Sequence, residues 1–492
     1  MDFSAEDLDQ LAERGIAPAE AQRQLAQLRS GQRPARLARP CTVGDGIRQL
    51  AAARQPALLE RFATAATAGR ISRFVPASGA ATRMFQPLQS GDSAPLQRFL
   101  AELDNFPFAV ALTEALTRSG RQLAEVRRAG DLPLLLATLL GTAGLDFARL
   151  PKGLLPFHRC GDKVRTAFAE QLAETAQLVG AGNPARLHCT VAAEHRSLFE
   201  RHLAACRQEL EQCYGAPLDV AFSVQHPATD TLALAADDSP LRDADGRLVL
   251  RPGGHGALLA NLAAAATEVV LIRNIDNVVP DRRKAANLHW DQLLAGLLLE
   301  LVETQRALLG ALRRHPADTA VRQRALAFLA DELGEPPAAG ETEPSRLAAR
   351  LDRPLRVCGM VANQGEPGGG PFWAHDAQGG LSRQIVEAAQ VDAEDPQQTA
   401  ILGAATHFNP VDMAVCLHDG SGRSYQLDWF VDQSAAIVTG KHQDGRPIRI
   451  LERPGLWNGG MAGWHTVFVE LPASTFNPVK TVFDLLRPAH QP

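Results

Sequence analysis

Lysine is scarce in this sequence of 492 residues. Only five of its 50 basic side chains are lysines, and they stand at Lys152, Lys163, Lys284, Lys441 and Lys480. An ammonium is a compact point charge, whereas a guanidinium is a planar fork, so a lysine kept in an arginine-rich chain can mark a site that needs compact charge. Mutational chance accounts for most of the five, so the scarcity serves only to rank these positions.

The sequence also lacks an excess of positive charge, a long apolar run and paired cysteines. Its net charge of −5 excludes a generally basic surface for nucleic acid. The most apolar uncharged run, 132–145, contains Pro133 and is too short for a membrane helix. Seven cysteines without a Cys-x-x-Cys spacing indicate reduced thiols. The acidic N-terminal sequence is not typical of a secretory signal, so we expect a cytoplasmic protein.

Ordinary globular composition and this length predict about two to four domains. Strand and helix patterns alternate through 70–290, which predicts an α/β fold with a parallel or mixed sheet. The expected parts are a helical N-terminal cap over 1–68, an α/β core over 69–415 with helical insertions at about 86–148 and 288–352, and a C-terminal α+β segment over 416–492 that ends in a helix at 481–486.

Polar and small residues follow three predicted strands, at 71–75, 218–224 and 269–275. Ligands of open α/β sheets bind beyond the carboxyl ends of strands. The residues there are Ser78, Gly79, Ala80, Ala81, Thr82 and Arg83 after the first strand, Gln225 and His226 after the second, and Asp276 and Asn277 after the third. A nucleotide site needs backbone donors for phosphate, an amide for the base and a carboxylate for Mg²⁺.

Each feature also has a structural explanation. Small residues at 78–81 allow an anion to approach the backbone closely. Many turns between a strand and a helix, however, have small residues for packing reasons, and for this segment taken alone we favour the packing explanation. Lys152 lies between two prolines, either presented to a ligand or simply exposed. The glycines around His255 favour a phosphate loop over an incidental turn. Asp276 is either a metal ligand or a capping residue, and Asn277 fits both roles.

Other segments leave two interpretations open. The glycine-rich segments 363–373 and 457–465 suit either a loop closing over a sugar, with Trp373 as a stacking face, or a rigid turn. His407 and Asp412 suit a second metal site, although a satisfied, partly buried histidine is the favoured interpretation.

Six segments, in chain order, resemble the motifs of UDP-N-acetylglucosamine and UDP-glucose pyrophosphorylases, which are sugar nucleotidyltransferases. Residues 78–83 resemble Gly-Gly-x-Gly-Thr-Arg, 151–154 the Pro-Lys-Gly loop, 252–256 the Gly-(His/Asn)-Gly loop, 275–278 the Asp-Asn motif, 384–387 the Val-Val-Glu segment, and 476–480 the late Phe-Ser-Pro-Leu-Lys. The whole chain also resembles a bacterial family, the domain of unknown function 4301. This second resemblance implies no particular activity.

The resemblance implies a Rossmann-like, GT-A-type fold and an Mg²⁺-dependent transfer. A sugar-1-phosphate oxygen would attack the α-phosphorus of UTP, and pyrophosphate would leave. The implied roles are catalysis by Arg83, Lys152 and Lys480, with Lys480 returned to the site by the C-terminal segment; nucleotide binding by Ser78, Gly79, Ala80, Thr82, Gln225 and Gly254; substrate binding by His255, Glu387 and Asn409; and Mg²⁺ binding by Asp276.

The departures from these motifs keep other functions open. Ser78 and Ala81 replace signature glycines, and the long gap between Arg83 and Lys152 requires the helical insertion. Because the turn is altered, one alternative is a protein that binds a nucleotide or nucleotide sugar without turning it over. A further alternative moves the nucleotidyl group to a phospholipid head group, an alcohol phosphate or a protein. A last alternative is an α/β protein whose glycine turns are purely structural. It requires that all six motif matches, in the same order along the chain, are coincidences.

Overall fold

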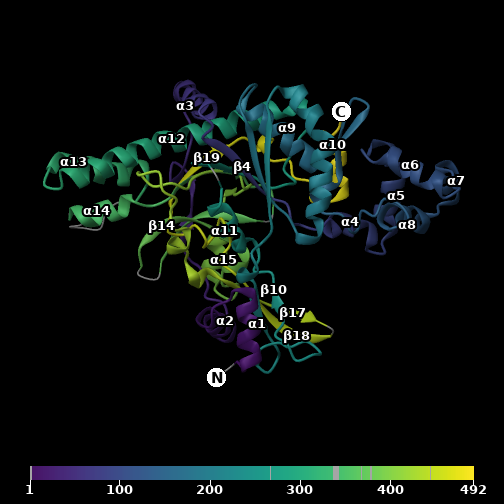
Figure 1. Cartoon of the computed structure of the whole chain (residues 1–492), viewed down its shortest axis with the longest axis horizontal. Coiled ribbons are helices and arrows are strands. Elements are labelled where there is room, and N and C mark those ends of the chain that lie inside the picture. The colour runs from purple at the N-terminus through teal and green to yellow at the C-terminus, as the bar shows by residue number, and fades with distance from the viewer. Residues whose placement is uncertain (1–2, 266, 336–342, 367, 377–378, 444) are drawn as a thin grey trace. The chain divides into compact units, whose positions relative to one another are not determined.

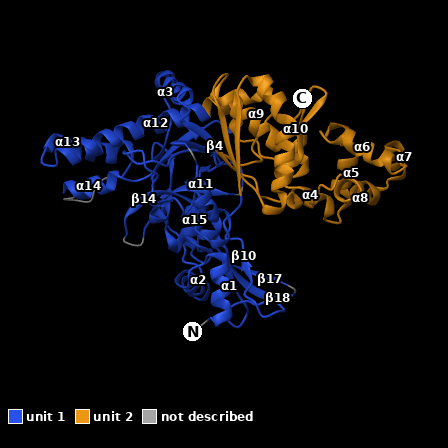
Figure 2. Ribbon diagram, in the orientation of Figure 1, with its two compact units in different colours: residues 1–72, 224–272, 291–473 blue, residues 73–223, 273–290, 474–492 orange. Residues whose placement is uncertain are grey.

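The chain divides into two structural units in the computed structural model (Figures 1 and 2). The structure describes residues 3–265, 267–335, 343–366, 368–376, 379–443 and 445–492. Unit 1 comprises 1–72, 224–272 and 291–473, and unit 2 comprises 73–223, 273–290 and 474–492. This differs from the three consecutive domains expected from the sequence, because each unit joins segments that are distant along the chain and local patterns do not report such contacts.

Unit 2 is built on parallel strands. Strands β4 (Ile71–Pro76), β7 (Ala185–Thr190) and β8 (Leu218–Ser223) pair in parallel in that order, and β4 belongs to unit 2 from Arg73 onward. Helix α9 (Ala167–Val179) packs against β7 and against α10 (Arg196–Tyr214). Since parallel strands share one carboxyl edge, the turns that follow β4 and β8 leave the same edge.

The segment between Arg83 and Lys152 is helical. It contains α4 (Thr82–Gln89), α5 (Ser93–Ala101), α6 (Ala109–Arg118), α7 (Leu123–Ala129) and α8 (Leu132–Leu140). Aromatic rings form its core: Phe106 and Phe108 stack with centroids 5.2 Å apart, and Phe99 lies 5.0 Å from Phe106. The insertion therefore buries its own apolar surface.

Unit 1 contains a mixed sheet. Its strands lie in the order β2 (Thr42–Val43), β3 (Gly46–Arg48), β19 (His465–Leu471), β12 (Leu355–Ala362), β16 (Met413–Cys416) and β11 (Val269–Ile272). β12 pairs in parallel with β19 and antiparallel with β16. Short β15 (His407–Phe408) also pairs with β12. The predicted α/β class with a mixed sheet is confirmed.

The described residues of the 288–352 region are mainly helical, as expected. Helix α12 (Lys284–Arg314), which belongs to unit 1 from Asp291 onward, is followed by α13 (Thr319–Ala327), a π-helical turn (Phe328–Glu332) and α14 (Pro344–Leu351) (Figure 1). Within the parts of the chain that are described, none of the helices is both long and apolar enough to cross a membrane.

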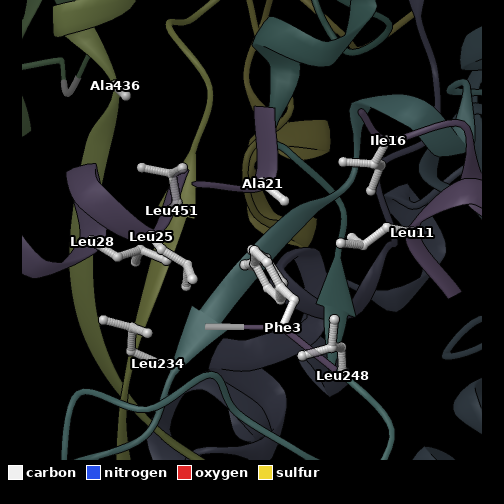
Figure 3. Packing of buried hydrophobic residues seen from close by; sticks show 11 residues of the cluster. Phe3, Leu11, Ile16, Ala21, Leu25, Leu28, Leu234, Leu248, Ala436 and Leu451 are labelled. Atoms are coloured by element: carbon white, nitrogen blue, oxygen red, sulfur yellow. The ribbon is translucent and has the colours of Figure 1, made fainter. Parts of the chain in front are cut away.

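Two smaller sheets complete unit 1. β1 (Arg36–Pro40), β13 (Gly369–His375) and β14 (Leu381–Glu387) form an antiparallel sheet, on which α15 (Pro396–Gly403) packs against β1. β10 (Leu250–Arg251), β9 (Thr231–Leu234), β18 (Arg446–Glu452) and β17 (Ile437–Gln443) form the other. Apolar side chains of α1 (Ala5–Arg14) and α2 (Pro18–Ser30), including Leu11 and Leu25, share a core with Leu234 and Leu451 of this second sheet (Figure 3).

Two secondary-structure expectations need correction. The described residues of 1–68 form not only helices, namely α1, α2, α3 (Gln55–Thr67) and a short 3₁₀-helix (Ala52–Arg54), but also the strands β1, β2 and β3, and β3 pairs with β19, more than 400 residues away. The 416–492 segment contains strands and 3₁₀-helices, and its described residues form no α-helix. Its expected final helix is the 3₁₀-helix Val482–Leu486. Pairing between distant strands leaves no local signal, which explains the first error.

Candidate functional site

Two lysines and one aspartate meet in unit 2. The Lys152 ammonium lies 2.7 Å from Asp276 Oδ2, and the Lys480 ammonium lies 3.1 Å from the same oxygen. The Lys152 and Asp276 side chains are 13% and 9% exposed, whereas Lys480 is 55% exposed. We call these three residues the lysine–aspartate cluster. It brings together three of the predicted site residues from three distant chain segments.

Burial and charge act against each other in this cluster. Burial disfavours the charged form of Asp276, but the ammoniums of Lys152 and Lys480 outweigh it and hold the pKa of this carboxyl below its usual value. Burial also lowers the pKa of Lys152, and Asp276 counteracts this. With Asp276 ionised and both lysines protonated, the cluster carries one net positive charge, which favours an anionic ligand.

Lys152 is held by the turn that follows β4. It opens a 3₁₀-helix (Lys152–Leu154), and its amide donates to the Gly79 carbonyl at 3.1 Å. Gly153 fits tightly, because a Cβ there would lie 2.9 Å from Cζ of Phe199 and 3.3 Å from Ile275. The glycine of the predicted Pro-Lys-Gly loop is therefore required for packing beside the residues that precede Asp276.

Lys480 reaches the cluster because the 474–492 segment pairs with the residues around Asp276. The Val479 amide donates to the Asp276 carbonyl at 3.1 Å, and the Asn477 amide donates to Asn277 Oδ1 at 2.8 Å. Asn277 is fully buried, and its side-chain amide also donates to the Thr475 carbonyl. Asn277 thus anchors this segment, a role that is neither of the two left open for it from the sequence.

Asp276 has one carboxylate oxygen to offer a metal. Its Oδ1 is buried and has no hydrogen-bond partner among the described residues. Mg²⁺ commonly binds one or two carboxylates together with substrate phosphates and water. Nowhere in the described residues do three or more His, Cys, Asp or Glu side chains form a group suited to a metal. The donor set therefore fits Mg²⁺ that is shared with a polyphosphate, because the adjacent ammoniums oppose binding of the metal alone.

The turn after β4 is open to solvent. Ser78, Gly79, Ala80, Thr82 and Arg83 are exposed. A Cβ at Gly79 would meet no atom within 4 Å, so this glycine has no packing requirement. Ala81 is fully buried, and Thr82 begins α4. The packing explanation that we favoured for small residues in this turn thus applies to Ala81 and fails for Gly79.

A second group of predicted residues meets in unit 1. His255 Nε2 lies 3.4 Å from Glu387 Oε1, and the His255 ring stacks on Trp457 with centroids 4.2 Å apart. We call His255, Glu387 and Trp457 the histidine–glutamate cluster. Burial opposes ionisation of Glu387, but hydrogen bonds from His255 and Trp457 hold its pKa below its usual value.

The backbone around His255 requires glycine. Gly254 has φ of 74°, and a Cβ at Gly256 would lie 2.0 Å from the Pro454 carbonyl oxygen. The Leu456 amide donates to His255 Nδ1 at 3.0 Å. Nδ1 is therefore unprotonated, and the ring presents an Nε2–H to Glu387. Trp457 was not singled out from the sequence, and its signal was the tryptophan and glycine content of 457–465.

Three other predicted residues, all in unit 1, have side chains that contact other groups of the protein. Gln225 Nε2 donates to Asp230 at 3.3 Å. Asn409 is buried, and its Oδ1 accepts the Val411 amide at 3.1 Å in a turn. His407 lies 3.6 Å from Glu470. The structure brings none of these side chains into the histidine–glutamate cluster.

Hydrogen bonds and a ring contact hold the 363–373 segment in place. Its residue 367 lies outside the described residues. Asn363 Oδ1 accepts the Gly365 amide at 2.9 Å. Trp373 Nε1 donates to Asp45 at 2.9 Å, and the Arg39 guanidinium lies over its ring. These contacts favour the rigid-turn interpretation over a free stacking face.

Solved structures share this fold. UDP-N-acetylglucosamine pyrophosphorylase from Trypanosoma brucei, solved with an inhibitor, aligns with a TM-score of 0.50 and 14% identity over 98% of this chain and 79% of its own. A UDP-glucose pyrophosphorylase mutant from Leishmania major, in complex with UDP-glucose, gives 0.46 and 11% over 98% and 79%. At such identities the first match establishes fold alone.

No curated protein matches the sequence. The model of one protein family, described as a domain of unknown function (DUF4301), matches residues 4–491. The resemblance stated from the motifs is thus confirmed for both the family and the fold. A match over nearly the whole length shows that the chain belongs to the DUF4301 family.

Proposed function

We propose that this protein is a nucleotidyltransferase that joins a nucleoside monophosphate to a sugar 1-phosphate, with UTP as the favoured donor. The observation that carries the proposal is the lysine–aspartate cluster, in which three distant segments place two ammoniums on one buried carboxylate. The fold shared with a UDP-N-acetylglucosamine pyrophosphorylase supports it. A GT-A-type core, Mg²⁺ dependence and a cytoplasmic location belong to the same proposal.

The reaction needs positioning and charge neutralisation. An oxygen of the sugar phosphate attacks the α-phosphorus, the bond from that phosphorus to the β-bridging oxygen breaks, and pyrophosphate leaves with the bond's electron pair. Lys152 and Lys480 supply positive charge to the phosphate oxygens, where negative charge develops in the transition state. Mg²⁺ held by Asp276 would neutralise further charge on the phosphates.

The ion pairs of the free protein prepare this site. Both ammoniums lie on Asp276 Oδ2, so the buried charges are paired before a ligand arrives. On binding, the ammoniums turn to the phosphate oxygens and the carboxylate is released for the metal. Lys480, which is 55% exposed, has the greater freedom to move. Triphosphate and metal should therefore bind cooperatively.

The remaining roles follow from chemistry and exposure. The open turn at 78–83 offers backbone amides and Arg83 to the nucleotide. In unit 1, the Glu387 carboxylate accepts hydrogen bonds from sugar hydroxyls, and Gly254 and His255 contact a phosphate. His255 acts as a neutral donor through Nε2, because its Nδ1 accepts the Leu456 amide. Gln225 and Asn409 have weaker claims as ligand contacts, since both side chains serve local turns.

The first experiment is thermal unfolding with each ribonucleoside triphosphate, with and without Mg²⁺. A ligand at 100 times its Kd adds about 2.7 kcal/mol to stability, which raises Tm by several degrees. We expect a magnesium-dependent rise with UTP. A panel of sugar 1-phosphates, scored by pyrophosphate release, then identifies the acceptor.

Lys480→Ala and Lys163→Ala form a matched pair for this assay. Lys163 is an exposed lysine of the same unit, paired with Glu209. We expect Lys480→Ala to abolish pyrophosphate release and Lys163→Ala to leave it unchanged. Absence of a Tm change with every triphosphate contradicts the proposal. A Tm rise without turnover on any acceptor assigns the protein to nucleotide binding instead.

A further inference from the structure

Two buried histidines join the 474–492 segment to the body of unit 2. His158 lies on β5 (Pro156–Cys160), and its Nε2 is 2.8 Å from His490 Nδ1. The rings stack with centroids 5.2 Å apart, and the two residues are 1% and 3% exposed. Neither the proposed reaction nor any motif uses this pair.

The proton arrangement of the pair follows from its neighbours. His158 Nδ1 is 3.0 Å from Glu170 Oε1, and Glu170 also pairs with Lys284 and lies 3.7 Å from Arg165. An ionised Glu170 requires a proton on His158 Nδ1. One proton then bridges His158 Nε2 and His490 Nδ1. Two fully protonated rings would direct two N–H groups at each other across 2.8 Å, which the docked geometry does not admit.

The groups around His490 disfavour a positive charge on its ring. His158 faces it from β5, Arg487 from its own segment and Arg283 from the 3₁₀-helix Asp281–Arg283. Burial, followed by His158 and Arg487, lowers the pKa of His490 to about 3, and a weaker backbone interaction at Asn477 acts in the opposite direction. Two carboxylates of unit 2 are already paired, Glu170 with Lys284, and Asp484 with Arg487 at 2.7 Å.

His490 lies on the same segment as Lys480. Val482 and Leu485, between Lys480 and His490, are fully buried. Arg282 donates to the carbonyls of Pro488 and Gln491 beyond them. Docking of residues 482–491 thus fixes the backbone that carries Lys480.

We propose that His490 is a positioning residue for Lys480: its neutral ring docks the 474–492 segment on His158, and protonation of His490 releases that segment. The docking is independent of any ligand, whereas its effect on Lys480 rests on the proposed function. A released histidine takes up a proton near pH 6.5. Because the docked ring resists that proton, the docking constant falls about tenfold for each pH unit below about 6.5.

Hydrogen exchange of the full chain between pH 5 and 8, corrected for intrinsic exchange, tests this directly. In the unmodified protein we expect the protection of 474–492 amides to fall about tenfold between pH 6 and pH 5, with little change above pH 7. His490→Asn keeps an amide donor near the Nδ1 position but does not titrate, so its protection should be independent of pH. His490→Ala should lose protection at every pH. His195→Asn, a partly exposed histidine of the same unit, should behave as the unmodified protein.

Three results would overturn the inference. They are constant protection in the unmodified protein, an unchanged pH dependence in His490→Asn, and full protection in His490→Ala. Affinity for UTP with Mg²⁺ provides the separate functional measurement, in which His490→Ala should weaken binding as Lys480→Ala does. If no nucleotide binds, the proposed function fails while exchange still reports the docking.

Discussion

Individual lysines of this protein serve different purposes. Lys152 and Lys480 share one carboxylate oxygen, and Lys284 is fully buried between Glu170 and Asp281. Lys163 is exposed. Scarcity therefore ranks positions that need a compact ammonium, but it does not separate a ligand-facing lysine from one that completes a buried ion-pair network.

Replacing Asp276 by asparagine tests the charge balance of the lysine–aspartate cluster. Asp276→Asn keeps the side-chain volume but leaves two ammoniums without a counter-ion, one of them largely buried. We expect the magnesium dependence of triphosphate binding to fall sharply and unfolding stability to drop by about 1–3 kcal/mol. Titration with Mg²⁺ at fixed UTP, together with urea denaturation, measures both. An unchanged metal response would make Asp276 purely structural.

Two glycines of unit 2 separate packing from ligand contact. A Cβ at Gly153 would overlap Phe199, whereas a Cβ at Gly79 meets nothing within 4 Å. We expect Gly153→Ala to cost about 1–3 kcal/mol of stability and Gly79→Ala to cost little. Gly79→Ala should instead weaken nucleotide binding. Urea denaturation and a binding titration on both variants check this, and equal destabilisation would contradict it.

At the scale of elements, the helical insertion holds the 474–492 segment through aromatic contacts. The Phe483 ring lies 6.5 Å from Phe106, and the Arg98 guanidinium sits 4.5 Å above it. Gln491 also donates to the Asn105 carbonyl. The insertion that lengthens the gap before Lys152 therefore supports the segment that carries Lys480.

Phe483→Ala should loosen both elements together. The loss of the ring contacts removes roughly 1–3 kcal/mol. We expect faster hydrogen exchange in residues 103–108 and 474–492. Trp429→Ala, which removes a ring that is 82% exposed, serves as the control and should change neither region. Faster exchange confined to one of the two regions would show that they are not coupled.

The elements differ in how well their sequences predict them. The insertion and α12 have helical periodicity, and both form helices. The strands between α2 and α3 are short and depend on partners such as β13 and β19, which no local pattern names. The motifs placed Lys152, Asp276 and Lys480 in one site, and these side chains do meet, although their catalytic roles stay predictions. The stacking of Trp457 on His255 and the anchoring role of Asn277 emerge only from tertiary contacts.

For the whole molecule, the buried carboxylates make stability depend on pH. Burial opposes ionisation of Glu170 and Glu174, yet neighbouring cations hold the pKa of each below its usual value. A carboxyl with a lowered pKa in the folded state contributes stability above its unfolded value, near 4, and loses that contribution as pH falls toward its folded value. We therefore expect the protein to lose stability in acid as these carboxyl groups become protonated.

We therefore expect two phases in the urea midpoint as pH falls. The first begins below about 6.5 and reflects His490 together with His188 and His202, whose pKa values burial also lowers, and the second, larger one begins below about 4.5 and reflects the buried carboxylates. His490→Asn should reduce only the first phase. A midpoint that stays constant from pH 7 to pH 3 would contradict both assignments.

The interleaved segments of the two units have a consequence for biosynthesis. Unit 2 takes its last segment from 474–492, after all of unit 1 has been made. At about 5–20 residues per second, a ribosome needs roughly half a minute to a minute and a half to reach this point. Until then the nascent chain has Lys152 and Asp276 but neither Lys480 nor His490. A chain still under synthesis thus holds an incomplete charge set, and the synthesis of residues 474–492 decides when the site becomes whole.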